Sequence, residues 1–209
     1  MKEDNFFLTL RNNDKIRLLI AGVVGIVHFY GVLQMFFNED FFELFNRLRM
    51  FTNISNIFIF VVLVLYFTGH KDKKWFSYVS TAALISILVT GIVYHVLLNE
   101  GNMTFDGHIV HTVNPLIYSI FYFLLVANPI KIRHFWIGLV LPVIYFSIIL
   151  IQGPFTAWYP YNFMDPTLPG KTIVTVLTFC LIYLLPAIAA FSIALIYLKN
   201  LYEKAINRS

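Results

Sequence analysis

Six long apolar runs follow one another along the chain, and short polar segments separate them. A helix needs about twenty apolar residues to cross the hydrocarbon core of a bilayer, which is roughly 30 Å thick. The runs are too long and too evenly apolar for the strands of a membrane barrel, in which apolar and polar residues alternate. We therefore predict an all-α membrane protein, a six-transmembrane-helix bundle that forms a single domain over residues 1–209. The spans are expected at residues 16–37, 50–68, 79–98, 109–127, 135–151 and 172–198.

Composition leads to the same class of protein. The chain is 59% hydrophobic and only 12% charged, whereas about a quarter of the residues of a soluble domain are charged. This is too little charge to cover a surface that faces water, so lipid is the expected solvent. The basic residues form short clusters and no continuous stripe, which argues against a nucleic-acid partner. Cys180 is the single cysteine and lies in an apolar run, so it is expected to be a buried hydrophobic residue, and neither a disulfide nor a cofactor is predicted.

The distribution of Lys and Arg predicts the direction of the spans. Twelve of these residues fall in segments expected on one side of the membrane and three in segments expected on the other. Because short loops with such an excess face the cytoplasm, both the N- and C-termini are expected to be cytoplasmic. The twelve are Lys2, Arg11, Lys15, Arg17, Lys71, Lys73, Lys74, Lys131, Arg133, Lys199, Lys204 and Arg208, and the three are Arg47, Arg49 and Lys171.

A polar stripe begins the second expected span. Arg49, Thr52, Asn53 and Asn56 lie at i, i+3, i+4 and i+7, a spacing that gathers a cation, a hydroxyl and two amides on one helical face. Such groups are costly in a bilayer unless they are paired or face a wet cavity. Two interpretations stay open. The stripe is either a functional site or an interfacial helix start, with Arg49 reaching the interface and the Asn residues bonding neighbouring helices.

A second polar stripe begins the fourth expected span, at the same predicted depth as Thr52. Pro115 in this stripe is expected to kink the helix or to lie in its first turns. His95, near the outer end of the third span, adds another imidazole on this side of the membrane. His28 lies deeper, in the first span, where an ionisable group is by default a functional candidate. The stripe consists of His108, His111, Thr112 and Pro115, again at i, i+3, i+4 and i+7.

The segment before the sixth expected span, residues 152–166, is rich in proline and aromatic residues. It should form an ordered cap without a long regular element. Trp158, Tyr159 and Tyr161 are expected to be interfacial anchors. Asp165 has three possible roles: to orient a histidine, to bind a cation, or to begin a turn.

The ordered set of these motifs resembles a known six-span family. The motifs are FTNISN at 51–56, HTVNP at 111–115 and YPYNFMD at 159–165. They occur in the order seen in the androgen-induced membrane hydrolases, the androgen-dependent regulator of tissue factor pathway inhibitor, and their bacterial relatives. The resemblance covers nearly the whole chain and implies hydrolysis of fatty acid esters of hydroxy fatty acids by an intramembrane threonine and histidine, which correspond to Thr52 and His111. The cap looks closer to the bacterial branch, which implies a bacterial plasma membrane and leaves the lipid substrate open.

The first functional hypothesis is therefore a hydrolase whose partner is a membrane lipid or fatty-acid ester. A threonine hydroxyl needs an adjacent base to take its proton, and a neutral imidazole, with an ordinary pKa of about 6.5, suits that role. Thr52 is the expected nucleophile and His111 the general base. Further residues are expected to bind substrate or to stabilise the oxyanion, and Arg49 has the alternative role of binding a fatty-acid carboxylate. These residues are Arg49, Asn53, Asn56, His95, His108 and Asp165.

Two further hypotheses belong to other classes. One is a metal-dependent hydrolase in which His95, His108 and His111, with Asp106 or Asp165, bind Zn²⁺. The other is a lipid-binding or transport protein without chemistry. Six spans without an internal repeat are atypical of a secondary transporter. The sequence sets no oligomeric state.

Overall fold

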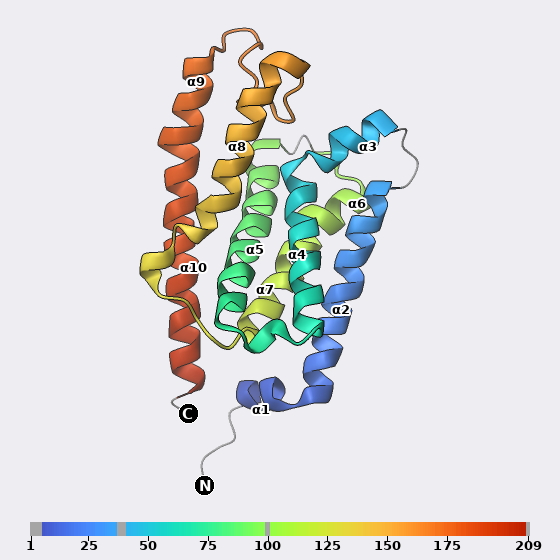
Figure 1. The fold of residues 1–209 in the computed structure, drawn as a ribbon, viewed down its shortest axis with the longest axis vertical. Helices are drawn as coiled ribbons and strands as arrows, with labels where there is room; N and C mark the ends of the chain where they lie inside the picture. The colour runs from blue at the N-terminus through green and yellow to red at the C-terminus, as the bar shows by residue number, and fades with distance from the viewer. Residues whose placement is uncertain (1–5, 37–40, 99–100, 208–209) are drawn as a thin grey trace.

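The computed structural model describes residues 6–36, 41–98 and 101–207, and in these residues all regular structure is helical (Figure 1). The long helices are continued or preceded by short 3₁₀ and π-helical turns. The elements in chain order are α1 (Phe6–Asn12), α2 (Asp14–Leu33), η1 (Gln34–Phe36), α3 (Phe41–Leu48), α4 (Phe51–Phe67), η2 (His70–Asp72), α5 (Lys74–Val93), η3 (Tyr94–Leu98), α6 (Phe105–His108), η4 (Ile109–Val113), α7 (Asn114–Leu125), η5 (Ile132–His134), α8 (Ile137–Thr156), η6 (Asn162–Met164), α9 (Ile173–Thr178), η7 (Phe179–Leu184) and α10 (Leu185–Ile206).

Five helical segments of the described chain are long and apolar enough to cross a membrane. A sixth span is counted if α4 is taken together with the short helix before it, from which it is bent by 70°. The described residues thus form an all-helical bundle with five or six helices that could span a membrane. The five segments are Asp14–Phe36, Lys74–Leu98, Phe105–Leu125, Ile132–Thr156 and Ile173–Ile206.

Five of the expected spans overlap these segments and the second overlaps α4, but several ends differ: the fourth span begins at Phe105 and the last continues to Ile206. The third begins at Lys74 rather than near residue 79, because its first turn is a polar stretch that hydropathy alone leaves outside the membrane. The fifth continues through Gly153 and Pro154 to Thr156, so the first residues of the expected cap are helical. Ala157 then takes a left-handed backbone conformation that ends the helix.

Helix α5 is the centre of the bundle. It packs against α4, α7, α8 and α10, while α2 packs on α4 and α7. Half of its apolar stretch is buried, more than in α2, α7, α8 or α10. Its polar side chains can be buried because several bond to carbonyls of their own helix, as Ser86 does to Ala82 (2.8 Å) and Thr81 to Ser77 (2.7 Å).

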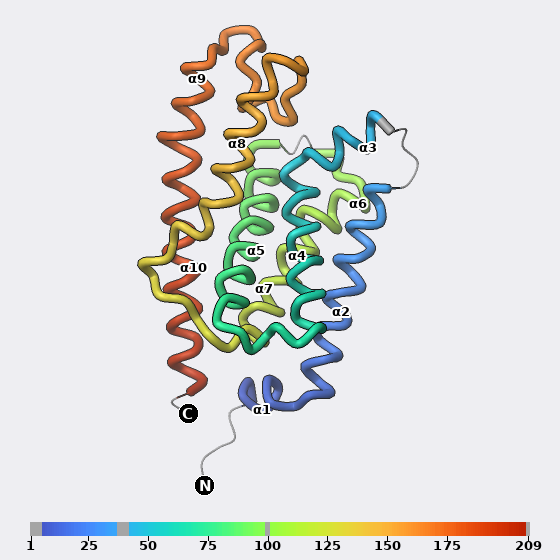
Figure 2. The backbone as a smooth tube through the Cα atoms, in the orientation of Figure 1, coloured from blue at the N-terminus to red at the C-terminus, as the bar shows by residue number. Residues whose placement is uncertain are grey.

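The N- and C-terminal helices end on the same side of the bundle, where α1 crosses beneath the other helices (Figure 1). We call the opposite side the distal end. There the chain between α8 and α9 forms a cap that turns back toward the bundle (Figure 2). Gly153 is required beneath this cap, because a Cβ atom at that position would lie 2.2 Å from the Tyr159 ring.

Three of the long helices contain a π-helical turn in their distal halves, namely η3, η4 and η7. Two of these turns lie directly before a proline, Pro115 in α7 and Pro186 in α10. Proline has no N–H to bond to the preceding turn and its ring crowds that turn's carbonyl, so the helix widens there. Of the two positions expected for Pro115, the structure shows it in the first turn of α7.

Candidate functional site

The two polar stripes meet inside the bundle. Asn114 Nδ2 donates a 2.6 Å hydrogen bond to Asn56 Oδ1, and both side chains are fully buried. Thr52 lies one helical turn before Asn56, and His111 lies three residues before Asn114. The bond therefore brings Thr52 and His111 to the same level at the distal end.

Helix α5 lies against both stripes at this level. A Cβ atom on Gly91 would lie 2.8 Å from the His111 carbonyl oxygen, so only glycine permits this approach. The neighbouring Thr90 shares a 2.8 Å hydrogen bond with Ser55 of α4, and Ser55 also donates to the Thr52 carbonyl (2.9 Å). Thr90 thus links the helix of Thr52 to the surroundings of His111.

The His111 imidazole is held in a fixed orientation. Its ring stacks on Tyr94, with centroids 3.8 Å apart and planes at 17°, and it lies against the backbone carbonyl of Thr90. The Nδ1 atom is buried and has no hydrogen-bond partner among the described residues. An oriented imidazole with one nitrogen free is suited to accept a proton.

Thr52 lines a small pocket at the distal end, with a cavity volume of about 30 Å³. Thr90 and Tyr161 contribute the other hydroxyl-bearing walls, and the remaining walls are apolar. Apolar walls of this kind suit contact with an acyl chain, and the pocket must widen to admit one. The apolar residues are Phe51, Val89, Val93, Leu98, Pro142, Phe146, Phe163 and Leu184.

Tyr161 comes from the cap, and its phenol lies beside the hydroxyl and backbone of Thr52. Its ring stacks on Phe163, with centroids 5.3 Å apart and planes at 4°. Behind it is Tyr145 of α8, whose buried hydroxyl lies beside the Tyr161 phenol and the Phe51 backbone. Burial raises the pKa of Tyr161, while its contact with Thr52 acts in the opposite direction. Tyr161 was expected to anchor the cap at the membrane interface; its side chain is half-buried and its phenol is turned toward Thr52.

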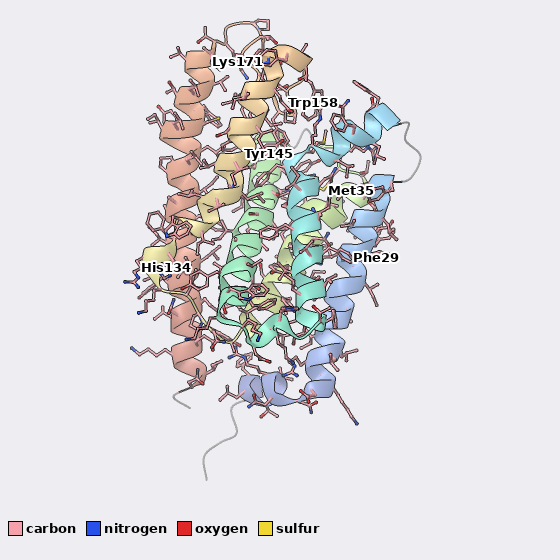
Figure 3. The ribbon with its side chains drawn as sticks, in the orientation of Figure 1. Phe29, Met35, His134, Tyr145, Trp158 and Lys171 are labelled. Carbon is pink, nitrogen blue, oxygen red and sulfur yellow. The ribbon has the colours of Figure 1, made fainter. Side chains whose placement is uncertain are left out.

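Arg49 lies at the same end of the bundle as the pocket, between two aromatic rings. Its guanidinium carbon is 4.4 Å from the Phe45 ring centroid and 4.1 Å from that of Trp158, and it also donates to Asn46. Trp158 therefore holds a cation in addition to any contact with lipid. Figure 3 shows Trp158 and Tyr145 at this end of the bundle, between α8 and the start of α4.

The two Asn side chains of the first stripe donate hydrogen bonds to backbone carbonyls near the start of α4. Asn53 Nδ2 donates to the Arg47 carbonyl (2.7 Å), and Asn56 Nδ2 donates to the Thr52 carbonyl (2.8 Å). These bonds fix the bend between α3 and α4 and the position of Thr52.

The remaining predicted residues lie around the site without forming a metal centre. His95 Nε2 is 3.0 Å from Thr112 Oγ1, and His108 is exposed. Asp165 accepts hydrogen bonds from the backbone and side chain of Thr167, which is the turn-forming alternative. Among the described residues, no three His, Cys, Asp or Glu side chains are close enough together to hold a metal ion.

His28 lies fully buried in α2, below the two stripes. Its Nδ1 is 2.9 Å from the Val24 carbonyl, and its ring meets Tyr118 edge-on at 5.9 Å. Its Nε2 atom has no partner in the part of the chain that the structure describes.

Sequence reasoning missed the contributions of Tyr161, Tyr145 and Thr90. Tyr161 was visible only as one of several aromatic residues in the cap. Tyr145 and Thr90 stand alone in apolar runs, and a single hydroxyl there forms no stripe that helical spacing could reveal.

No family model, curated protein or solved structure matches the chain.

Proposed function

We propose that this chain is an intramembrane hydrolase of lipid esters, with Thr52 as nucleophile and His111 as general base. The observation that carries the proposal is the position of the Thr52 hydroxyl on the wall of an apolar pocket, level with an oriented imidazole on a neighbouring helix. The resemblance to the androgen-induced hydrolases suggests a fatty-acid ester as substrate. The reaction requires no cofactor, and the proposed location is a bacterial plasma membrane with both termini in the cytoplasm.

The proposed reaction has two stages. Thr52 Oγ1 attacks the ester carbonyl carbon while its proton passes to His111, and the carbonyl oxygen becomes an oxyanion. The tetrahedral intermediate expels the alcohol, which takes the proton from His111. Water, activated by His111, then hydrolyses the acyl-threonine and releases the fatty acid.

Proton transfer needs His111 to approach Thr52 directly or through one water molecule. In the described chain no hydrogen bond joins the two side chains, since His111 contacts Tyr94 and Thr90 while Thr52 lies beside Tyr161. Catalytic hydrogen bonds often tighten only when substrate binds. A substrate ester placed between the Tyr161 phenol and Thr52 would break the contact between the two hydroxyls and leave the Thr52 hydroxyl open to His111.

The test is hydrolysis by purified protein in lipid nanodiscs, with p-nitrophenyl palmitate, monoacylglycerol and fatty acid esters of hydroxy fatty acids as substrates. We expect Thr52→Ala to abolish turnover and His111→Gln to reduce it by about 10²–10⁴-fold, the contribution of a general base. Thr52→Ser should retain activity. Thr68→Ala, at the other end of α4 where the side chain is exposed, is the matched control and should have no effect. Wild-type rates in Thr52→Ala and His111→Gln would remove the mechanism.

A second candidate function is lipid binding without chemistry. It is favoured by one observation, the contact of Thr52 with Tyr161 instead of His111. A fluorophosphonate probe with a long alkyl chain separates the two candidates. Covalent labelling of Thr52 supports the hydrolase, whereas saturable, unlabelled binding of the lipid with no turnover supports the binding protein.

A further inference from the structure

A tetrahedral intermediate on Thr52 carries a negative oxygen, which needs a hydrogen-bond donor within the pocket. The donors expected from the sequence do not line this pocket. Asn53 bonds to the Arg47 carbonyl and Asn56 to the Thr52 carbonyl. The Arg49 guanidinium is held between two rings and bonded to Asn46, while its Nε has no hydrogen-bond partner in the described chain.

The Tyr161 phenol occupies the position that these groups leave open. It lines the same pocket as Thr52 and lies beside the Thr52 hydroxyl. The stacking of its ring on Phe163 fixes its direction. A donor next to the nucleophilic oxygen lies close to the place where the oxyanion of the attacked carbonyl forms.

We propose that the Tyr161 hydroxyl donates a hydrogen bond to the oxyanion formed when Thr52 attacks the ester, which makes the cap a part of the catalytic site. This inference rests on the proposed function. In the step, the Thr52 Oγ1–carbon bond forms, the carbonyl π pair moves onto oxygen, and the Thr52 proton goes to His111. Tyr161 keeps its own proton throughout and shares it with the oxyanion in a hydrogen bond.

Tyr145 is the positioning residue behind Tyr161. Its buried hydroxyl lies beside the Tyr161 phenol and the Phe51 backbone, and its ring centroid is 6.5 Å from that of Tyr161. When Tyr161 donates to the oxyanion, the Tyr161 oxygen is free to accept from Tyr145. Such a chain strengthens the first hydrogen bond because each bond polarises the next.

The protonation state of Tyr161 suits this role. Burial raises the pKa of its phenol above the ordinary value of 10.0. The phenol therefore stays protonated, and able to donate a hydrogen bond, to a higher pH than a free tyrosine.

The experiment compares Tyr161→Phe with Tyr159→Phe, a matched control in the same cap whose ring packs over Gly153. Both are measured on p-nitrophenyl palmitate. We expect Tyr161→Phe to lower kcat by about 10²–10³-fold, as for loss of one oxyanion donor, with KM nearly unchanged, and Tyr159→Phe to retain kcat. Tyr145→Phe should give a smaller loss in kcat. Unchanged kcat in Tyr161→Phe would overturn the inference.

Two further measurements separate this role from a structural one. A long-chain trifluoromethyl ketone forms a tetrahedral adduct with the nucleophile, and Tyr161→Phe should weaken its inhibition by the same factor as kcat, while palmitate binding stays the same. Incorporation of 3-fluorotyrosine at position 161 keeps the side chain's shape and lowers its pKa, so it should move the alkaline limb of the pH–kcat profile downward. Equal weakening of palmitate and ketone binding, or an unmoved alkaline limb, would contradict the inference.

Failure of the inference is distinguishable from failure of the proposed function. If the wild-type protein hydrolyses the ester and a fluorophosphonate labels Thr52, the hydrolase stands, and the Tyr161 variants then decide the role of the cap alone. If the wild-type protein neither hydrolyses nor is labelled, the proposed function and the inference built on it both fail.

Discussion

At the scale of residues, the most strongly bound polar group lies far from the candidate site, at the end of the bundle that holds the termini. Glu203 forms a two-pronged ion pair with Arg11 (both bonds 2.7 Å) and a third bond to Lys199 (2.6 Å). All three residues are buried. The two cations also donate to the carbonyls of Tyr122, Phe123 and Leu124, the last turn of α7. They thereby satisfy groups that a helix end leaves unpaired.

We predict that Glu203→Gln destabilises the protein by about 3–5 kcal/mol, because it leaves two buried cations without their counter-ion. Lys204→Gln, on the exposed neighbouring position, should change the stability by less than about 0.5 kcal/mol. Urea titration of the protein in mixed micelles measures the difference. Equal stability of the two variants would show that α1 and α10 are not held together by this cluster.

At the scale of elements, the approach of α5 to the start of α7 determines the site. Gly91 allows the backbone of α5 to lie against the His111 carbonyl, and Thr90 next to it forms part of the pocket wall. The π-helical turn η4, which precedes Pro115, sets the direction in which His111 leaves the helix. The geometry of the site thus follows from the packing of two backbones.

We predict that Gly91→Ala lowers the stability by about 1–3 kcal/mol, the usual cost of overpacking, because the added Cβ would meet backbone at 2.8 Å. Hydrolysis should fall with it, since His111 is displaced. Gly22→Ala in α2, where nothing lies within 4 Å of the added Cβ, is the control and should leave both unchanged. Thermal unfolding and p-nitrophenyl palmitate turnover measure the two effects. If Gly91→Ala were as stable and active as Gly22→Ala, the close approach of Gly91 to the His111 carbonyl would not determine the geometry of the site.

At the scale of the whole molecule, the charge bias and the fold agree on one arrangement. Helix α1 and the end of α10 share one end of the bundle (Figure 1), and the candidate site lies at the other, together with Arg49 and Lys171. The proposed topology, which follows the positive-inside rule, directs the pocket toward the outer leaflet.

We predict that a cysteine at Thr167 in the cap is labelled by a membrane-impermeant maleimide in intact cells, and that one at Lys204 is labelled only after permeabilisation. Both positions are exposed, and the native Cys180 is buried and replaced by alanine in these variants. The reverse labelling pattern would show that the topology is opposite to the proposed one. Labelling of both sites in intact cells would contradict the placement of cap and C-terminus on opposite sides.

Much of the fold could be predicted from the sequence, but only part of the candidate site. Apolar runs near the length of the hydrocarbon core identify the spans, and helical spacing identifies the two polar stripes, since both signals are local. The bend between α3 and α4 and the extension of α8 to Thr156 escaped prediction. They depend on side-chain contacts between consecutive elements, such as Asn53 with the Arg47 carbonyl and Gly153 with the Tyr159 ring, which helical periodicity does not reveal.

The sequence by itself determined that this chain belongs in a membrane, roughly where it crosses, and which polar residues share a helical face, because lipid imposes hydrophobic length and helices impose their period on the order of residues. Tertiary structure alone decided which faces meet. It joined Asn56 to Asn114, turned Tyr161 toward Thr52, and gathered Arg11, Lys199 and Glu203 around the end of α7. The physical reason is that buried polar groups must find partners, and in this bundle many of those partners are distant along the chain.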